Sequence, residues 1–171
     1  MDGMAKPKPF AVSDRDAPAY WLADDLWVVL ATGEQTGGRY SVVEQWMPEG
    51  SGPPPHVHAF EDEAFFVMEG EMTLEVGGEP LVAGPGSLAS VPRNTVHSFK
   101  VTKGPAHVLN YYTPAGFEQA IMGCARPAES RTLPPVGLDP PDSPQVVRFF
   151  NNYWIAPADV PWARQDIDRD E

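Results

Sequence analysis

Positive charge and cysteine are both scarce in this sequence. Twelve Lys and Arg residues stand against 24 Asp and Glu residues, which gives a formal net charge of -12. Nucleic acids and anionic membrane surfaces bind proteins that gather positive charge, so neither is an expected partner. The one cysteine, Cys124, permits no intramolecular disulfide and favours a reducing compartment. No His-bearing nucleophile signature surrounds Cys124, so we expect it to be a small apolar residue on a helix.

Long apolar runs are missing as well. No segment approaches the roughly 20 apolar residues that a membrane-spanning helix needs. The first ten residues are polar and broken by proline, unlike the apolar centre of a signal peptide. These features predict a cytoplasmic protein without a membrane partner.

Proline and glycine, in contrast, are abundant, with 20 and 15 residues among 171. They separate short strand-like runs at even spacing, a pattern typical of an antiparallel sandwich or barrel. The length suits a single domain over 1–171, with a barrel core over about 26–113 and a helical, Pro-rich extension over 114–171. We expect strands over 26–32, 40–47, 64–68, 71–76, 80–83, 87–91, 97–102 and 107–112, and helices over 114–122 and 145–154.

Three of the four histidines stand in one frame with a glutamate. His56 and His58 are two residues apart, and in a strand this spacing points both imidazoles at one face. Glu63 starts the next strand-like run, and His97 starts a later one. Three imidazoles and one carboxylate make a mixed shell for one divalent ion of Fe, Ni, Mn, Co or Zn. Four protein ligands on an octahedral ion leave two positions open, which is typical of a catalytic metal site.

The sequence around these four residues is distinctive. Residues 50–70 read GSGPPPHVHAFEDEAFFVMEG, and residues 86–97 read GSLASVPRNTVH. These stretches resemble the first and second motifs of the cupin family, and the resemblance implies an all-β protein, a single antiparallel jelly-roll β-barrel that holds one divalent ion with the four residues named above. Two positions depart from the family pattern, because Asn94 stands where Gly is usual and Val101 where Asn is frequent. Asn tolerates a left-handed turn and Val101 is not a ligand position, so we expect the metal site to be intact.

A longer stretch resembles one group within that family. Residues 53–78, together with YYTPAGFEQAI at 111–121, are similar to the single-barrel cupins grouped with quercetin 2,3-dioxygenase. This resemblance implies a homodimer and a metal-dependent dioxygenase for an aromatic or enolic, flavonol-like molecule, with Glu63 as both ligand and catalytic base. A fold does not fix a reaction, so two alternatives stay open. One is a redox-neutral isomerase, lyase or polyketide cyclase that uses the ion as a Lewis acid, and the other is a non-catalytic cupin that only binds a small ligand.

Strand alternation predicts which residues face the ion. Counting from Glu63 places Phe65 and Val67 on the metal side, and counting from His97 adds Phe99. An apolar or aromatic small-molecule ligand is therefore expected. Candidates for the mouth of the pocket are Trp46, Met47, Tyr111, Tyr112, Phe117 and Met122.

Three further titratable residues near the motifs receive other predictions. His107 lies outside both motifs, and we expect a hydrogen-bonded barrel histidine there. Glu61 and Asp62 precede Glu63, and we expect both to be solvated loop carboxylates, with the alternative that either replaces Glu63 as ligand if the strand register is shifted.

Overall fold

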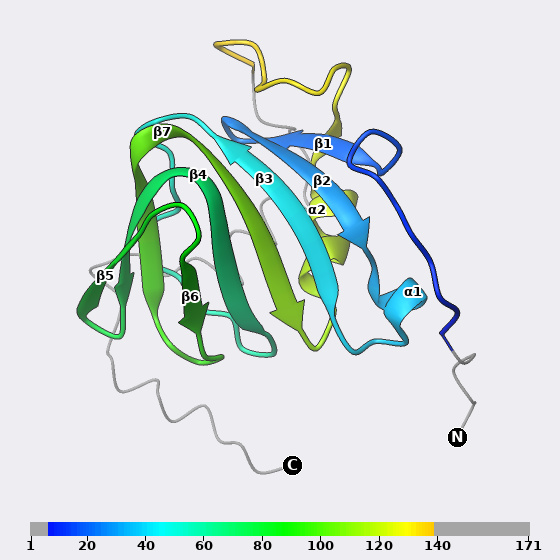
Figure 1. The fold of residues 1–171 in the computed structure, drawn as a ribbon, viewed down its shortest axis with the longest axis horizontal. Helices are drawn as coiled ribbons and strands as arrows, with labels where there is room; N and C mark the ends of the chain where they lie inside the picture. Colours follow the sequence, from blue (N-terminus) through cyan, green and yellow to red (C-terminus); the bar gives the residue numbers. More distant parts are fainter. Residues whose placement is uncertain (1–6, 139–171) are drawn as a thin grey trace.

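The computed structural model describes residues 7–138, and antiparallel strands dominate them (Figure 1). The strands form one sheet in the order β5–β4–β7–β3–β2–β1–β8, with β6 beside β4, which confirms the predicted all-β jelly-roll class. The elements are β1 (Ala19–Leu22), β2 (Asp25–Ala31), α1 (Gly33–Thr36), β3 (Ser41–Met47), β4 (Asp62–Val76), β5 (Glu79–Ala83), β6 (Leu88–Val91), β7 (His97–Thr113), α2 (Phe117–Cys124) and β8 (Arg126–Pro127).

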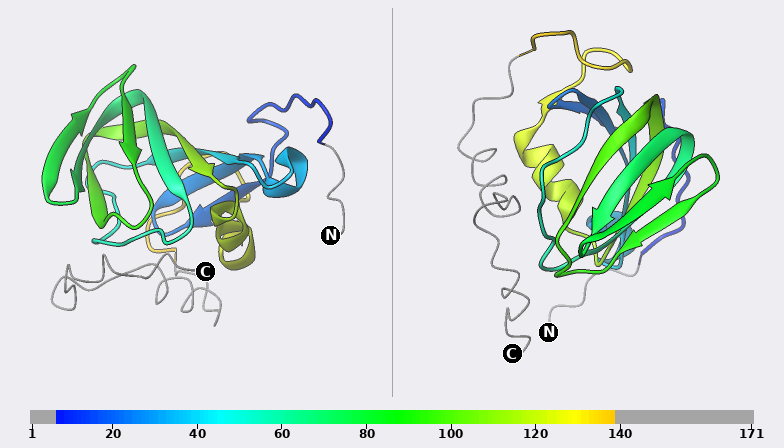
Figure 2. Two further views of the ribbon diagram at one scale, coloured as in Figure 1. Left: turned by 90° about the horizontal axis from the view of Figure 1, so that it is seen from below. Right: turned by 90° about the vertical axis from the view of Figure 1, so that its left-hand side faces the viewer.

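The long strands β4 and β7 bend together and give the sheet its curl (Figures 1 and 2). Their register shifts between Val67 and Met72, on both sides of Gly70. Gly70 has a φ of 78°, and a Cβ there would lie 2.7 Å from both Ala106 Cα and Lys103 O. Only glycine fits this bend. The register shifts mark a β-bulge, in which an extra residue bends the strand without ending it. The sequence-based prediction of a strand break at Gly70, and of another break within β7, is therefore wrong.

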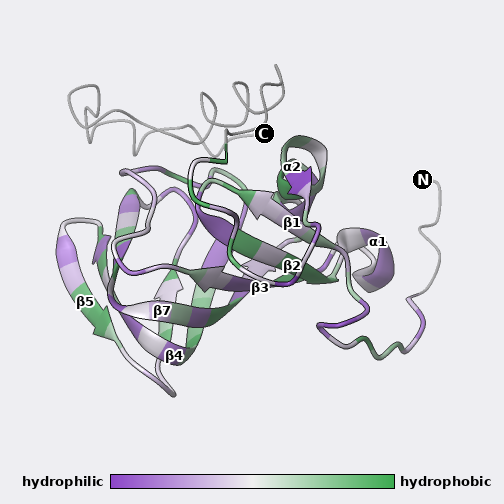
Figure 3. Cartoon of the chain, turned by 90° about the horizontal axis from the view of Figure 1, so that it is seen from above, coloured by the Kyte–Doolittle hydropathy of each residue, from purple (hydrophilic) through white to green (hydrophobic). Residues whose placement is uncertain are grey.

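The main apolar core fills the inside of this curl. Neighbouring residues of a strand point to opposite faces, and their hydropathy varies accordingly along the strands (Figure 3). Met72, Leu74, Val101 and Val108 are at most 1% exposed in this core.

A second core lies where α2 packs beside β1 and β3. Ile121 and Cys124 are buried there, so Cys124 is an apolar helix residue as expected. The helix begins at Phe117 rather than at residue 114, because Gly116 is non-helical and its N–H donates to Glu118 Oε2 at 2.8 Å. The strands β1 and β8 and the helix α1 were not predicted, since each has four residues or fewer and shows little periodicity.

Several predictions concern parts of the chain or properties beyond these elements. The expected helix over 145–154 lies outside the described residues. Within 7–138, no helix has the length and apolar character needed to cross a membrane. The single domain over the whole chain, the cytoplasmic location and the homodimer stay predictions.

Candidate metal centre

Strand pairing brings the four predicted ligands together from three segments. Glu63 is the second residue of β4, His97 is the first residue of β7, and His56 and His58 lie on the connection between β3 and β4. His56 and His97 exchange both backbone hydrogen bonds, at 2.8 and 2.9 Å. The strand geometry on which the spacing argument for these two histidines relied is limited to this single bridge, because the preceding prolines at 53–55 have no N–H to continue a ladder.

Asn94 fixes the other end of the histidine segment. Its backbone N–H donates to the carbonyl oxygen of His58 at 2.8 Å. Asn94 has a φ of 60°, in the left-handed region that Asn adopts more readily than other non-glycine residues. The departure from the family's usual glycine is therefore accommodated, as the sequence predicted.

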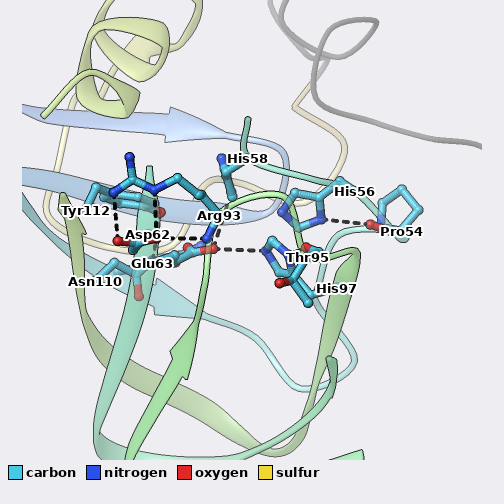
Figure 4. A network of polar contacts seen from close by, with 11 residues as sticks. Pro54, His56, His58, Asp62, Glu63, Arg93, Thr95, His97, Asn110 and Tyr112 are labelled. Atoms are coloured by element: carbon cyan, nitrogen blue, oxygen red, sulfur yellow. Dashed lines mark hydrogen bonds and ion pairs between the residues drawn. The ribbon is translucent and has the colours of Figure 1, made fainter. Parts of the chain in front are cut away.

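The ligand atoms of the four residues all lie within 4.8 Å of one another. All four side chains are buried, with 1% to 7% of each residue exposed. Figure 4 shows Glu63 next to His97, and Glu63 Oε2 lies 3.0 Å from His97 Nε2 and 3.3 Å from His58 Nε2. The cluster therefore has the compactness that coordination of one ion requires.

The hydrogen bonds behind the imidazoles test whether this cluster fits a metal ion. His56 Nδ1 lies 3.0 Å from Pro54 O, and His97 Nδ1 lies 2.9 Å from Thr95 O. A carbonyl oxygen only accepts, so each Nδ1 carries the hydrogen and each neutral ring turns the lone pair of Nε2 the other way. The Nε2 lone pair of His97 then faces Glu63 Oε2, and two such electron-rich atoms repel each other. A cation coordinated by both atoms would make this arrangement favourable. Imidazoles held in this way by backbone carbonyls are typical of metal ligands, so the residues fit a divalent ion.

The pKa values point the same way. Burial and the nearby His97 and His58 lower the pKa of His56 from 6.5 to about 3. Burial alone raises the pKa of Glu63, but the adjacent His58 and His97 outweigh it and hold that pKa below its ordinary range. At neutral pH His56 is neutral and Glu63 is ionised, which are the protonation states that metal coordination requires.

A cavity of about 100 Å³ opens onto this cluster, and Phe99, Tyr112 and Phe117 line it as the sequence predicted. Met47 and Phe65 are fully buried in the core instead. Alternation correctly predicted that Phe65 points into the barrel. It does not predict whether an inward-facing side chain lies beside the cavity or deeper in the core. Whether Phe99 and Phe117 bind substrate stays a prediction.

The other predicted mouth residues do not line this cavity. Trp46 stacks on His107, with ring centroids 4.1 Å apart, and Tyr111 stacks on Tyr40 at 5.3 Å. Met122 is 37% exposed on α2. Each of Trp46 and Tyr111 is next in sequence to an inward-facing residue, so the alternation of a strand turns it to the opposite face.

The remaining titratable residues near the motifs divide between confirmed and wrong predictions. His107 is a hydrogen-bonded barrel histidine as expected, paired with Glu44. Asp62 is part-exposed as expected, but it is the first residue of β4 rather than a loop residue, and it forms an ion pair with Arg93 at 2.8 Å. Glu61 is buried rather than solvated, and this burial raises its pKa.

A group of polar residues on the cavity wall was missed altogether. Gln45 donates to Asp25 at 2.7 Å, Ser51 donates to Asp25 at 2.8 Å, and Asn110 donates to Gln45 at 2.8 Å. Burial, together with the charge of Asp24, raises the pKa of Asp25 to about 8. Gln45 and Asn110 are polar residues at inward positions of strands, and this pattern is the signal that could have revealed them.

Comparison with known proteins agrees with the sequence motifs. Residues 42–112 match the family described as Cupin domain. A quercetin 2,3-dioxygenase of Bacillus subtilis is 27% identical over 82% of this chain, and one of Aspergillus japonicus is 26% identical over 70%. The chain spans only 40% and 36% of the lengths of these two relatives.

Solved structures support the fold independently. KdgF from Halomonas sp. superposes with a TM-score of 0.58 at 18% identity, covering 66% of this chain and 98% of that protein. An RmlC-like cupin from Shewanella frigidimarina gives 0.57 at 18% identity, with coverage of 65% and 96%. Fold, motifs and relatives agree: residues 42–112 match the Cupin domain family, and the described strands have the jelly-roll cupin fold.

Proposed function

We propose that this protein is a metal-dependent dioxygenase that acts on a small phenolic or enolic molecule. The observation that carries the proposal is the compact, buried set of three imidazoles and one carboxylate, of which His56, His58 and Glu63 line a cavity. The quercetin 2,3-dioxygenases among the relatives support the reaction class. Both atoms of dioxygen would enter the organic product, so the substrate supplies all the electrons and no further reductant is needed.

Each residue of the cluster has a role in this proposal. His56, His58, His97 and Glu63 would hold one divalent ion of Fe, Ni, Mn, Co or Zn. When bound, the ion would acidify a hydroxyl of the substrate and orient it. The Glu63 carboxylate would accept the proton from that hydroxyl, because it is the one carboxylate within the cluster.

The cavity itself narrows the substrate class. Among residues 7–138, no Lys or Arg lines it, whereas Trp27, Phe99 and Phe117 supply aromatic surface. Its volume of about 100 Å³ is smaller than the ~150 Å³ of a cavity that takes up benzene, so it encloses at most one ring. The enclosed part of the substrate is therefore an uncharged ring, and further rings of a flavonol-like molecule would extend toward the mouth.

One observation favours a second candidate, a redox-neutral isomerase, lyase or cyclase. The cavity contains Glu63, which is ionised, and Asp25, whose raised pKa keeps it protonated at neutral pH. A base and an acid in one cavity can move a proton between two positions of a substrate without dioxygen. Product formation under strict exclusion of oxygen would support this candidate against the dioxygenase.

The test of the proposed function begins with the metal. Protein purified without added metal is expected to hold close to one divalent ion per chain by elemental analysis, and His56→Ala and Glu63→Ala are expected to lose it. His107→Ala is the matched control, because this histidine lies outside the cluster and should leave the metal content unchanged. A wild-type chain that takes up no divalent ion would contradict the proposal.

Oxygen consumption tests the reaction. With a panel of flavonols and polyketide-like phenols, the metal-loaded protein is expected to consume one dioxygen per substrate, and the two alanine variants are expected to consume none. Turnover that persists in metal-free protein would contradict a role for the ion.

A further inference from the structure

A chain of buried side-chain hydrogen bonds lines the cavity outside the candidate metal cluster. Asp25 on β2, Gln45 on β3 and Asn110 on β7 come from three strands and all line the cavity. Gln45 Nε2 donates to Asp25 Oδ2 at 2.7 Å, and Asn110 Nδ2 donates to Gln45 Oε1 at 2.8 Å. The exposed fractions are 6% for Asp25 and 1% for each amide, so these groups are withdrawn from bulk water.

This chain fixes the orientation of the Asn110 amide. Asp25 Oδ2 accepts from Gln45 Nε2 when the carboxyl proton lies on Oδ1, which is 2.8 Å from Ser51 Oγ, and Ser51 Oγ in turn can donate to Asp24 Oδ1 at 2.9 Å. This arrangement turns the Gln45 carbonyl toward Asn110. Asn110 must then present its NH₂ group to Gln45, and the contact of the same Nδ2 with the Tyr112 hydroxyl oxygen at 3.4 Å agrees. Asn110 Oδ1 is left buried, without a hydrogen-bond partner anywhere in the described part of the chain. A buried acceptor is destabilising unless a donor reaches it, and Asn110 is one of the residues that line the cavity, so a donor on a molecule in the cavity would satisfy it.

We propose that Asn110 Oδ1 accepts a hydrogen bond from a hydroxyl group of the substrate, and that the substrate is an uncharged aromatic molecule with a second hydroxyl apart from the metal-bound oxygen. The inference rests on the proposed function, because it takes this cavity as the substrate site. Asp25 and Gln45 are positioning residues that act through Asn110.

The charges around this position exclude an acidic substrate group there. Asp24 and Asp25 both line the cavity, and none of the lining residues is Lys or Arg within 7–138. A carboxylate on the ligand at this position would meet the charge of Asp24 and find no Lys or Arg side chain to pair with. A hydroxyl group, in contrast, supplies the donor that Asn110 lacks and carries no charge.

Matched one-ring probes test this inference. Hydroquinone and resorcinol each carry a second hydroxyl, and 4-methoxyphenol and 3-methoxyphenol replace that hydroxyl with a methyl ether. Titrations followed by NMR, with metal-loaded protein and without oxygen, are expected to show that at least one diol binds roughly 5- to 10-fold more tightly than its ether, as one net hydrogen bond provides. In Asn110→Leu the diol and its ether are expected to bind equally, and 4-hydroxybenzoate is expected to bind both proteins with the same affinity, because its carboxylate gains nothing from Asn110.

The positioning role has its own matched pair of variants. Asp25→Asn keeps an oxygen that can accept from Gln45, so the preference for the diol should remain. Asp25→Leu removes that acceptor, so the preference should fall to that of Asn110→Leu.

Several results would overturn the inference. Wild-type protein that binds neither diol, or binds each diol and its ether equally, contradicts it. A preference that survives in Asn110→Leu shows that the methyl group is excluded by its size alone, and an affinity for 4-hydroxybenzoate that falls in Asn110→Leu contradicts the uncharged ligand group at this position. Elemental analysis of each variant separates the two proposals: absence of metal from the wild type contradicts the proposed function, whereas normal metal content without any dependence on Asn110 contradicts only this inference.

Discussion

The buried carboxyl of Asp25 makes the stability of this protein depend on pH in a direction that is unusual for an aspartate. Asp25 is 6% exposed, and burial together with the Asp24 charge raises its pKa from 3.8 to about 8. Between these two values the unfolded chain releases the proton while the folded chain keeps it. The unfolded state then binds fewer protons, so stability is fully present below about pH 4 and falls as the pH rises toward 8.

The expected size follows from one proton per molecule. The slope is about 1.4 kcal/mol per pH unit, and between pH 4 and pH 7 the loss reaches about 4 kcal/mol. Asp25→Asn carries no such proton but keeps an acceptor for Gln45. The free energy of unfolding of the variant minus that of the wild type should therefore increase by about 4 kcal/mol over this range, whatever constant offset the substitution adds.

Urea unfolding followed by circular dichroism at pH 4, 5, 6, 7 and 8 measures this difference, with a chelator present so that metal binding contributes to neither protein. Asp24→Asn is the control, because removal of the neighbouring charge lowers the pKa of Asp25 and should move the upper end of the window to lower pH. A difference between wild type and Asp25→Asn that stays constant with pH would show that Asp25 is ionised throughout, and would refute the assignment.

Two further predictions concern the frame around the site. Gly70→Ala places a Cβ 2.7 Å from a backbone carbonyl of β7 at a φ of 78°, so we expect the free energy of unfolding in urea to fall by about 2–4 kcal/mol. Gly78→Ala is the control, because its Cβ meets open space at a φ of 90°, and it should cause a smaller loss. Equal losses in the two variants would contradict the role of the bend at Gly70. Glu118 accepts from the backbone N–H groups of Gly33 and Gly116, both at 2.8 Å. Burial raises its pKa, but these hydrogen bonds outweigh burial and lower it, so the stabilisation is present above pH 4.5 and is lost as the pH falls below it. Glu118→Gln should lower the free energy of unfolding by about 1–3 kcal/mol at pH 7 and by less at pH 3. A loss that is the same at both pH values would contradict hydrogen bonding by the ionised Glu118 carboxylate.

The metal cluster could be predicted from the sequence because its residues stand in short contiguous stretches. His56, His58 and Glu63 fall within eight consecutive positions, and His97 ends the second motif. Spacing within such a stretch determines which side chains can share one ion, even though the histidine segment turned out to be a bridged loop rather than a strand. Local sequence therefore specifies this part of the site.

The inward or outward direction of a side chain could also be predicted, but only where a reference residue was available. Alternation from His97 gave Phe99 correctly. Two pairs of sequence neighbours, Trp46 with Met47 and Tyr111 with Tyr112, were both predicted to line the mouth of the pocket. Neighbouring residues of a strand point to opposite faces, so only one residue of each pair can face the pocket. In both pairs the second residue faces inward and the first faces out.

The polar wall depends on relations that no contiguous stretch contains. Asp25 and Gln45 are 20 residues apart, and Gln45 and Asn110 are 65 apart. They meet because β3 pairs with β2 on one side and with β7 on the other, in a register that places Gln45 opposite Trp27 and opposite Val108. A slip of one residue in either pairing would turn the inward-facing residues to the other face, so the register decides what the cavity presents to a ligand. The candidate metal ligands are thus specified by local motifs and the cavity wall by strand register, so members of one fold family can share a ligand set and differ in the wall that a small molecule would meet.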